Sequence, residues 1–468
     1  MIGRVLLILL AVAGPLSAAP FGELFTDKTM RVDYFHTGGK GEEIVALDRV
    51  VSDGPWPGSR TQLVDTTNLG KYLFEVIDRS NNQVIYSRGF ASIFSEWETT
   101  GEAKTRHATF HESLRFPWPK VPVQVVLKKR DSDHAFQQIW STIIDPASRF
   151  VNPAEAKPAG RVTTIFENGP AAQKVDLLLI AEGYTEGEAG KFQADAKRLV
   201  AKLFATEPFK SRQRDFNVRT LHIPSAKSGV HRPRTRDDRR TAVSTEYNIF
   251  DSERYALTYD NRALRDAASA APYEFIEILL NEKQYGGGGI FNDQATTSVD
   301  SAFSDYVFVH EFGHHFAALG DEYYTSDVSY ETGGAEHPEP WEPNITANGS
   351  SPKWKELVDS GVPLPTPWEK EAYEAHQREY QAERRKIRES NEPESVMDEL
   401  FRREQAWSTK HLSSQKYAGK VGAFEGAGYE AKGLYRPEVD CIMFTRDEVG
   451  FCRVCARAIN RIIDFYSK

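Results

Sequence analysis

The chain has 468 residues, of which 40% are hydrophobic and 27% charged, so it is long enough for two or three domains that each bury a core. Its formal net charge of −9 argues against nucleic-acid binding as its main role. After the N-terminal segment, no apolar run approaches the length of a membrane span, which argues against an integral membrane protein.

Residues 1–19 have the pattern of a secretory signal peptide. Arg4 precedes the apolar run 5–12, Gly14 and Pro15 interrupt that run, and the small residues 17–19 offer a cleavage site. The run is too short to span a membrane. We therefore expect a soluble mature protein that is secreted or periplasmic, with a buried N-terminal segment or a retained anchor as the alternatives.

Residues 20–150 are predicted to form an antiparallel β-sandwich. Apolar and β-branched runs such as 72–77, 84–90 and 121–127 have the length of strands and are separated by turn residues. His107 and His111 are four apart, a spacing that on a strand is too long for one small ion. The segment 151–163, rich in proline and alanine, is interpreted as a linker.

Residues 164–468 are predicted to form a second domain of the α/β type, so the whole chain is expected to have an α+β fold with two domains. The nearly continuous apolar run 175–180 is typical of a strand buried on both faces. A capping box at 185–188 opens a helix, and another strand is expected at 216–223. A further helix is predicted from about 272 to 282.

A glycine-rich stretch at 285–292 follows. Its consecutive glycines do not favour a helix, and they allow close approach of another backbone. Two interpretations remain open: a flexible loop, or an edge strand at Gly287, Gly288 and Gly289 that pairs with an extended peptide through main-chain hydrogen bonds.

The strongest chemical pattern is His310-Glu311-x-x-His314, inside an apolar segment predicted to be a helix over 301–320. Residues four apart lie on one face of a helix, so both imidazoles can reach one metal ion. Glu311 stands beside them, where a carboxylate can hold a metal-bound water. Imidazole ligands suit zinc, and a catalytic zinc takes three protein ligands.

The third ligand is predicted to be Asp321. On a continued helix Asp321 would lie about 10 Å along the axis from His314, too far to share a metal. A left-handed turn at Gly320 would end the helix and let Asp321 fold back. The alternatives for the third ligand are Glu322, Glu425 and Asp440.

The C-terminal part begins with a highly charged segment, 367–412, that we interpret as a helical insertion. All three cysteines come later. In an exported protein a disulfide joining Cys441 to Cys452 or Cys455 is expected. A structural zinc site built on the same cysteines would need a fourth ligand, and a redox role for the last two is a further alternative.

Several motifs together resemble the IgA peptidase family of bacterial zinc metallopeptidases. They are His310 to His314 with 319–324, 422–428, 435–437, 441–443 and 451–455. The resemblance covers about residue 173 to the C-terminus, and the β-rich region before it resembles the N-terminal domain of the family. It implies a metzincin-like catalytic domain in which Met443 lies in a turn beneath the metal. The chain departs from the usual metzincin spacing, because Ala317 and Gly320 stand where that pattern has a glycine and the third ligand.

The resemblance implies an exported zinc-dependent metalloendopeptidase that acts on proteins or peptides, in which Glu311 assists attack by a zinc-bound water. A tyrosine often stabilises the oxyanion in such sites. Tyr324 and Tyr429 are the main candidates, together with Tyr323 and Tyr435. Two rival functions stay open: another zinc amidohydrolase acting on cell-wall peptides, or a surface-binding protein with a silent metal site.

Overall fold

The structure, a computed structural model, describes residues 20–157, 159–235, 238–326 and 338–468. The predicted signal peptide at 1–19 lies outside the described residues. Among the helices of the described ranges, none is both long enough and apolar enough to cross a membrane.

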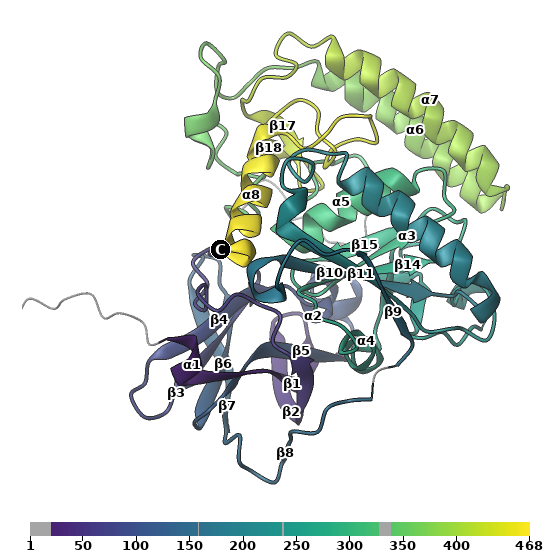
Figure 1. The fold of residues 1–468 in the computed structure, drawn as a ribbon. Coiled ribbons are helices and arrows are strands. Elements are labelled where there is room, and N and C mark those ends of the chain that lie inside the picture. The colour runs from purple at the N-terminus through teal and green to yellow at the C-terminus, as the bar shows by residue number, and fades with distance from the viewer. Residues whose placement is uncertain (1–19, 158, 236–237, 327–337) are drawn as a thin grey trace, which may run out of the picture.

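Two four-stranded sheets build the N-terminal region, shown in purple and blue in Figure 1. One has the order β5-β1-β2-β8 and the other β4-β3-β6-β7. Their bounds are β1 Phe25–Gly39, β2 Glu42–Pro55, β3 Tyr72–Asp78, β4 Val84–Phe90, β5 Ala108–Pro119, β6 Val123–Arg130, β7 Phe136–Ile144 and β8 Val151–Asn152. Buried and partly exposed residues alternate along the whole of β3, as expected for a strand with one face on a core. That core joins both sheets, because Val32 and Phe116 of the first pack with Phe74 and Val125 of the second.

A six-stranded mixed sheet with the order β15-β16-β14-β10-β11-β9 forms the centre of the second region. Strands β16, β14, β10 and β11 run parallel, and the two outer strands run antiparallel to their neighbours. The bounds are β9 Arg161–Phe166, β10 Val175–Glu182, β11 Phe216–His222, β14 Phe275–Leu280, β15 Gly287–Ile290 and β16 Gln294–Ser298. All eight residues of β10 are buried, as expected for a strand covered on both faces.

Helices cover both faces of this sheet. Leu177 and Leu179 of β10 share a core with α3 Ala189–Leu203, α5 Ser304–Ala317 and α8 Arg453–Ser467. Leu178 and Ile180 point to the opposite core, which contains α4 Asn261–Ala268. The side chains alternate because successive residues of a strand face opposite sides. The remaining short elements are α1 Phe21–Leu24, α2 Ile93–Trp97, β12 Thr245–Tyr247, β13 Ala256–Thr258, β17 Phe424–Ala427 and β18 Glu430–Arg436.

The predicted helix at 272–282 is wrong, because this segment contains strand β14. Six apolar or buried residues in a row fit a fully covered strand as well as a helix, and periodicity alone does not separate them. The helix of this region lies earlier, at α4, where Asp260 caps it by accepting a hydrogen bond from the Ala263 N–H at 3.0 Å.

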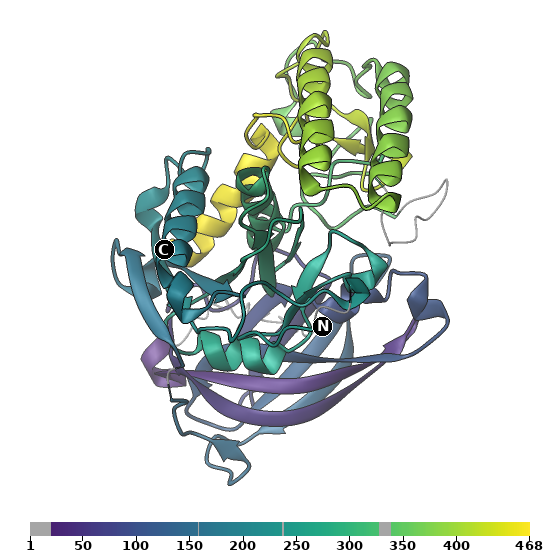
Figure 2. The same ribbon diagram turned by 90° about the vertical axis from the view of Figure 1, so that its right-hand side faces the viewer.

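The charged segment contains two antiparallel helices, α6 Lys370–Glu389 and α7 Glu394–Ser413, which lie side by side at the top of both views (Figures 1 and 2). Most of their large apolar residues are buried, although Val396 of α7 is 38% exposed. Tyr380 of α6 and Phe401 of α7 pack in one cluster with Tyr285. The same cluster contains Phe303 and Val307, which lie at the start of α5. The hairpin therefore packs against the helix that carries the two histidines.

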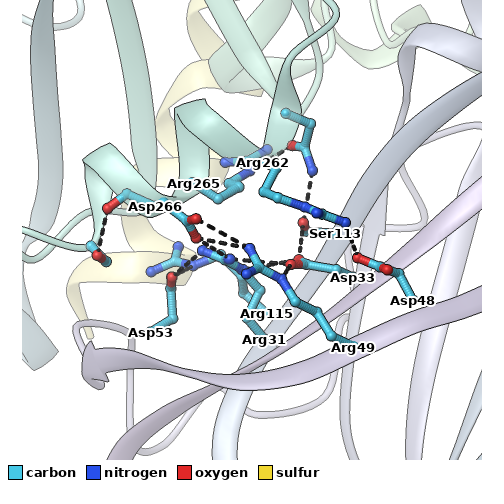
Figure 3. A network of polar contacts seen from close by, with 12 residues as sticks. Arg31, Asp33, Asp48, Arg49, Asp53, Ser113, Arg115, Arg262, Arg265 and Asp266 are labelled. Atoms are coloured by element: carbon cyan, nitrogen blue, oxygen red, sulfur yellow. Dashed lines mark hydrogen bonds and ion pairs between the residues drawn. The ribbon is translucent and has the colours of Figure 1, made fainter. Parts of the chain in front are cut away.

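A polar network, buried at Arg31, Asp33 and Asp53 but partly exposed at Arg49 and Asp266, joins the N-terminal strands to α4 of the second region (Figure 3). Arg31 of β1 donates to Asp33 at 2.9 Å, to Asp53 at 2.7 Å and to Asp266 of α4 at 2.5 Å. Arg49 also donates to Asp33, at 2.7 Å, and to Asp266, at 2.9 Å. Because buried charges need partners, these shared aspartates fix how the two regions meet.

Candidate metal centre

Helix α5 positions the two histidines. Phe308, Phe312 and Phe316 recur every four residues and are fully buried in the core, so the helix is held by one apolar face. His310 and His314 share the neighbouring face. The helix ends at Ala317, and Ala318 takes the left-handed conformation with φ of 56°. The predicted left-handed turn at Gly320 is therefore wrong in position, although the chain does reverse after the helix.

Gly320 has a different role. A Cβ on this residue would stand 2.6 Å from the Cδ1 atom of Ile345, so a larger residue here would require the Ile345 side chain to shift. The Asn344 side chain fixes the same residue, accepting from the Gly320 N–H at 2.8 Å and donating to the Gly320 carbonyl at 2.9 Å. This anchored turn brings the next residue, Asp321, back to the two histidines.

Three donor atoms converge at the site. Asp321 Oδ1 lies 3.0 Å from His310 Nε2 and 3.2 Å from His314 Nε2, and the two Nε2 atoms are 3.1 Å apart. Ligands about 2.0–2.1 Å from a tetrahedral zinc ion are separated by roughly 3.3 Å, so these spacings fit one small ion. His310 is 4% and Asp321 is 8% exposed, which keeps competing water from most of the cluster.

The contacts of the Nδ1 atoms show whether the Nε2 atoms, which face the cluster, present a proton or a lone pair. His310 Nδ1 lies 2.9 Å from the Ile442 carbonyl oxygen, and His314 Nδ1 hydrogen-bonds the Leu319 carbonyl oxygen. A carbonyl only accepts, so both Nδ1 atoms donate and, in the neutral rings, both Nε2 atoms present lone pairs. Two imidazole lone pairs and a carboxylate pointing at one place are mutually repulsive unless a cation lies between them. The donor set and its supporting shell therefore fit zinc.

The pKa values of the ligand groups also indicate that a cation belongs between them. Burial lowers the pKa of His314, but the Asp321 carboxylate outweighs burial and raises it to about 9. Burial acts to raise the pKa of Asp321, and the two histidines outweigh it and hold this pKa well below its usual value. In the absence of a metal a proton would occupy the cluster, so a divalent ion has to displace it, as is usual at metal sites.

Glu311 lines a cavity of about 420 Å³ together with His314 and Asp321. Burial raises the pKa of the Glu311 carboxyl, which makes it a better proton acceptor than an exposed glutamate. Ser95 and Glu96, from α2 of the N-terminal region, line the same cavity. Both regions of the chain therefore form its wall.

The four residues 321–324 alternate between two sides. Asp321 and Tyr323 line the cavity, whereas Glu322 and Tyr324 are directed away from it. Tyr324 packs beside Phe444, with ring centroids 6.4 Å apart, and does not reach the metal cluster. The sequence-based choice of Tyr324 as an oxyanion donor therefore does not fit the geometry.

Two tyrosines do reach the site. The Tyr429 hydroxyl donates to Asp321 Oδ2, and the Tyr323 hydroxyl accepts from an Nη atom of Arg254 at 3.2 Å. Tyr435 lies instead in strand β18, with its ring against Gly349. Arg254 was missed by the sequence analysis, since it precedes His310 by more than fifty residues and belongs to no motif. It reaches the cavity because the segment before β13 runs beside β15, where the Gly287 N–H donates to the Arg254 carbonyl at 3.1 Å.

The alternative third ligands are occupied elsewhere. Glu425 pairs with Lys370 at 2.8 Å, and Asp440 accepts from the Thr445 hydroxyl at 2.7 Å. Glu322 is fully buried and hydrogen-bonds Asn344 at 2.9 Å, on the far side of the chain from the histidines. Among the four candidates, Asp321 is the one whose carboxylate contacts both histidines.

Met443 and its neighbours pack beneath the helix. A Cβ on Gly313 would stand 3.0 Å from Met443 Sδ, so the glycine lets the turn approach α5 closely. Ile442 supplies the carbonyl that orients His310, and the Met443 carbonyl accepts from the Glu322 N–H at 2.8 Å. The turn thus contacts both the helix and the segment that carries Asp321.

The glycine-rich stretch forms β15, the outer strand of the central sheet, paired with β16. A Cβ on Gly287 would lie 2.7 Å from Val307, and one on Gly289 would lie 2.4 Å from the Glu311 carbonyl oxygen. Gly288 faces the Tyr255 ring, which a Cβ would meet at 2.6 Å. These glycines let the strand lie directly against α5, and two of them, Gly287 and Gly289, line the cavity.

The three cysteines are free thiols in the structure, so the predicted disulfide is not formed there. The Sγ atoms of Cys441 and Cys455 are 3.9 Å apart, about twice the length of a disulfide bond. All three are buried close to one another.

Comparison with known families gives two matches. The family described as IgA Peptidase M64 matches residues 163–463, and the one described as Peptidase M64 N-terminus matches residues 20–141. No curated protein matches the chain. Since the first match alone covers more than half of the chain, the family is established, and membership supports a metallopeptidase with protein or peptide substrates. The chain belongs to the IgA peptidase M64 family.

Proposed function

We propose that this protein is an exported zinc-dependent metalloendopeptidase with a metzincin-like catalytic domain. The observation that carries the proposal is the convergence of His310 Nε2, His314 Nε2 and Asp321 Oδ1 within 3.2 Å of one another, next to Glu311 in a cavity. Three protein ligands leave a tetrahedral zinc one position for chemistry, in contrast to a structural site in which all four positions are filled.

His310, His314 and Asp321 would hold the zinc, which supplies a Lewis acid that polarises a peptide carbonyl and lowers the pKa of water. Glu311 then takes a proton from the attacking water as its oxygen bonds to the carbonyl carbon. The same carboxyl returns the proton to the amine as the C–N bond breaks. Burial raises the pKa of Glu311, which makes its carboxylate a stronger proton acceptor than that of an exposed glutamate.

One hydroxyl group beside the cluster would bind the carbonyl oxygen as that oxygen gains charge. Tyr429 already donates to Asp321, so its hydroxyl is at the metal cluster. Arg254 lines the cavity and brings a positive charge that is absent from the ligands themselves. We assign the role of oxyanion donor to Tyr429, whose single O–H would turn from Asp321 to the carbonyl oxygen, and to Arg254 the role of holding Tyr323.

A substrate chain would lie along β15. This strand is at the end of the central sheet, and its glycines bring the backbone next to Glu311. The Gly287 N–H already bonds the Arg254 carbonyl, so an extended peptide would add to the part of this edge beyond Gly287, through main-chain hydrogen bonds that recognise a peptide largely independently of its side chains. The N-terminal region would form the opposite wall through Ser95 and Glu96.

The test uses the chain from residue 20 onward, with zinc content measured by mass spectrometry and cleavage measured on peptides blocked at both termini. Wild type should carry zinc and cut internal bonds. Glu311→Gln should keep the zinc and lose about 100-fold or more in kcat/KM, since it removes the proton acceptor. Glu371→Gln, an exposed glutamate on α6, is the matched control and should behave as wild type.

Each other outcome points to a different conclusion. Zinc without cleavage of any peptide would support a surface-binding protein with a silent site. Cleavage restricted to cell-wall peptides would support the amidohydrolase. Equal cleavage by Glu311→Gln and wild type would remove the role assigned to Glu311. Export is tested separately, by sequencing the N-terminus of protein recovered outside the cytoplasm, which should begin near residue 20.

A further inference from the structure

A second group of metal-binding side chains lies behind the candidate active site. Cys441, Cys452, Cys455 and Glu322 come from three separate segments, and each offers one ligand atom within 4.8 Å of the other three. Their exposed fractions are 0%, 5%, 0% and 0%, respectively. Burying thiolates and carboxylates in an apolar core costs free energy unless a cation neutralises them.

The separations match a tetrahedral ion. Around a zinc with Zn–S of about 2.3 Å and Zn–O of about 2.0 Å, two sulfurs lie roughly 3.8 Å apart and a sulfur and an oxygen roughly 3.5 Å apart. The Sγ atoms of Cys441 and Cys455 are 3.9 Å apart, and Cys455 Sγ is 3.4 Å from Glu322 Oε1. A disulfide would require about 2.05 Å between sulfurs.

Backbone N–H groups donate to two of the three sulfurs. The Cys452 N–H points to Cys441 Sγ at 3.3 Å, and the Cys455 N–H points to Cys452 Sγ at 3.4 Å. Cys452 is also the N-cap of α8, where the helix dipole favours negative charge. These contacts stabilise thiolates, the form in which cysteine binds metals.

Glu322 adds independent support for a bound cation, because one of its buried carboxylate oxygens lacks a hydrogen-bond partner among the described residues. Its Oε1 atom accepts from Asn344 at 2.9 Å, while its Oε2 atom, also buried, has no hydrogen-bond partner within the described part of the chain. An unpartnered carboxylate oxygen in a core is expensive unless a cation neutralises it. Arg436, fully buried, interacts with Glu322 electrostatically, but its Nη atoms donate to the carbonyls of Gly426 and Val439.

We infer that Cys441, Cys452, Cys455 and Glu322 bind a second zinc ion, in a closed structural site separate from the candidate active site. Four protein ligands leave no position for water, so this ion has no catalytic role of its own. Three thiolates favour zinc over calcium or magnesium, which prefer oxygen. Glu322 is therefore not an alternative third ligand of the first site but a ligand of the second.

The second site would brace the first. Glu322 follows Asp321 directly in the chain, and Cys441 precedes Met443 by two residues. The ion would tie both segments to the start of α8, in the place where a disulfide was expected. Asp321 would then be held by the hydrogen bonds between Gly320 and Asn344 on one side and by a metal-bound neighbour on the other.

The experiment measures zinc per chain in the protein from residue 20 onward, purified with and without added zinc. Wild type should bind two zinc ions. Cys455→Ser should bind one, His314→Ala should bind one, and the double variant should bind none. Glu438→Gln, three residues from Cys441 but outside the cluster, is the matched control and should bind two. Because each variant removes a different ion, failure of the first site and failure of the second are distinguishable.

Cobalt substitution keeps the test independent of whether the cysteine variant folds. Cobalt-loaded wild type and cobalt-loaded His314→Ala should both show thiolate-to-cobalt charge-transfer absorption, and a thiol-specific mercurial should release one zinc ion per wild-type chain. Absence of this absorption, or a wild-type mass lower by two hydrogens with a single free thiol, would overturn the proposal in favour of a disulfide. A wild-type stoichiometry of one that disappears in His314→Ala would also overturn it.

Discussion

Among the residues that the structure describes, two groups of histidine and aspartate have ligand atoms close enough to share one ion, and they differ in what surrounds them. One is the His310–His314–Asp321 cluster, and the other is the Asp33–Asp48–His111 cluster of the N-terminal strands. The distances between ligand atoms therefore do not distinguish the two clusters. What distinguishes them is the group that supplies positive charge to the carboxylates.

Guanidinium groups already satisfy the Asp33–Asp48–His111 cluster (Figure 3). Asp33 accepts from Arg31 and Arg49, and Asp48 accepts from Arg262. At the His310–His314–Asp321 cluster the outer histidine nitrogens point to backbone carbonyls, so the inner lone pairs face one another. A group of histidine and carboxylate is thus an ion-pair network in the N-terminal strands, where arginines contact its aspartates directly, and a proposed metal centre at His310, His314 and Asp321.

The largest expected effect comes from removing His314, and removing His111 from the other cluster is the comparison. His314→Ala should abolish zinc binding at the candidate active site and reduce kcat/KM beyond the roughly 100-fold loss typical of outer-shell changes. His111→Ala should leave zinc content and kcat/KM as in wild type. Loss of zinc from His111→Ala would show that the arginines do not exclude a metal from the N-terminal cluster.

The next effect comes from removing an arginine. Arg31→Met would leave Asp33 and Asp53 buried with one fewer cation, and should lower the free energy of unfolding by about 3–5 kcal/mol, as measured by urea denaturation. Arg60→Met is the matched control, because the Arg60–Asp27 pair is exposed and worth at most about 1 kcal/mol. Folded Arg31→Met should keep its zinc, and a loss below about 1 kcal/mol would contradict the structural role of the network.

The buried histidine His36 should make the free energy of unfolding depend on pH, whereas arginines stay charged over the same pH range. Burial lowers the pKa of His36, but Glu112 and Glu43, at 2.9 and 2.8 Å, outweigh it and raise the pKa to about 9. Because the folded pKa exceeds the unfolded value of about 6.5, the stabilisation is complete below pH 6.5 and is lost as the pH rises through 9, on the order of 3 kcal/mol in total. Unfolding measured between pH 6 and 10 should show this loss, and His36→Gln should flatten it. Constant wild-type stability across that range would refute the assignment.

The sequence predicts the first cluster well where its geometry is local. Four-residue spacing on a helix places His310 and His314 together without knowledge of the rest of the fold. Asp321 required a guess about the turn, and the residue that reverses the chain is Ala318 instead of Gly320. Glycine is the usual residue at a left-handed position, so composition pointed to the wrong one.

Other features depend on contacts that no local pattern contains. Arg254 reaches the cavity because its segment runs beside β15, and Glu322 meets the cysteines because side chains alternate after the turn. The strand β14 was mistaken for a helix because a short apolar run has no distinguishing period. An extended backbone at residues 321–324 would direct alternate side chains to opposite sides, and this follows from the sequence if the chain is extended there. With Asp321 facing the proposed metal, it favours Tyr323 over Tyr324 as the tyrosine that lines the cavity.

The smallest expected effect distinguishes two tyrosines that both contact the His310–His314–Asp321 cluster. The Tyr429 hydroxyl donates to Asp321 Oδ2, and the Tyr306 hydroxyl lies 3.1 Å from His310 Nδ1. Tyr429→Phe should keep the zinc and lower kcat/KM by about 10–100-fold, since it removes a contact to a ligand and the proposed oxyanion donor. Tyr306→Phe should change kcat/KM only a few-fold, because the Ile442 carbonyl still orients His310. Steady-state kinetics on one blocked peptide compares them directly. An equal loss in both variants would mean that Tyr429 acts on the ligand geometry alone and not on the reacting carbonyl.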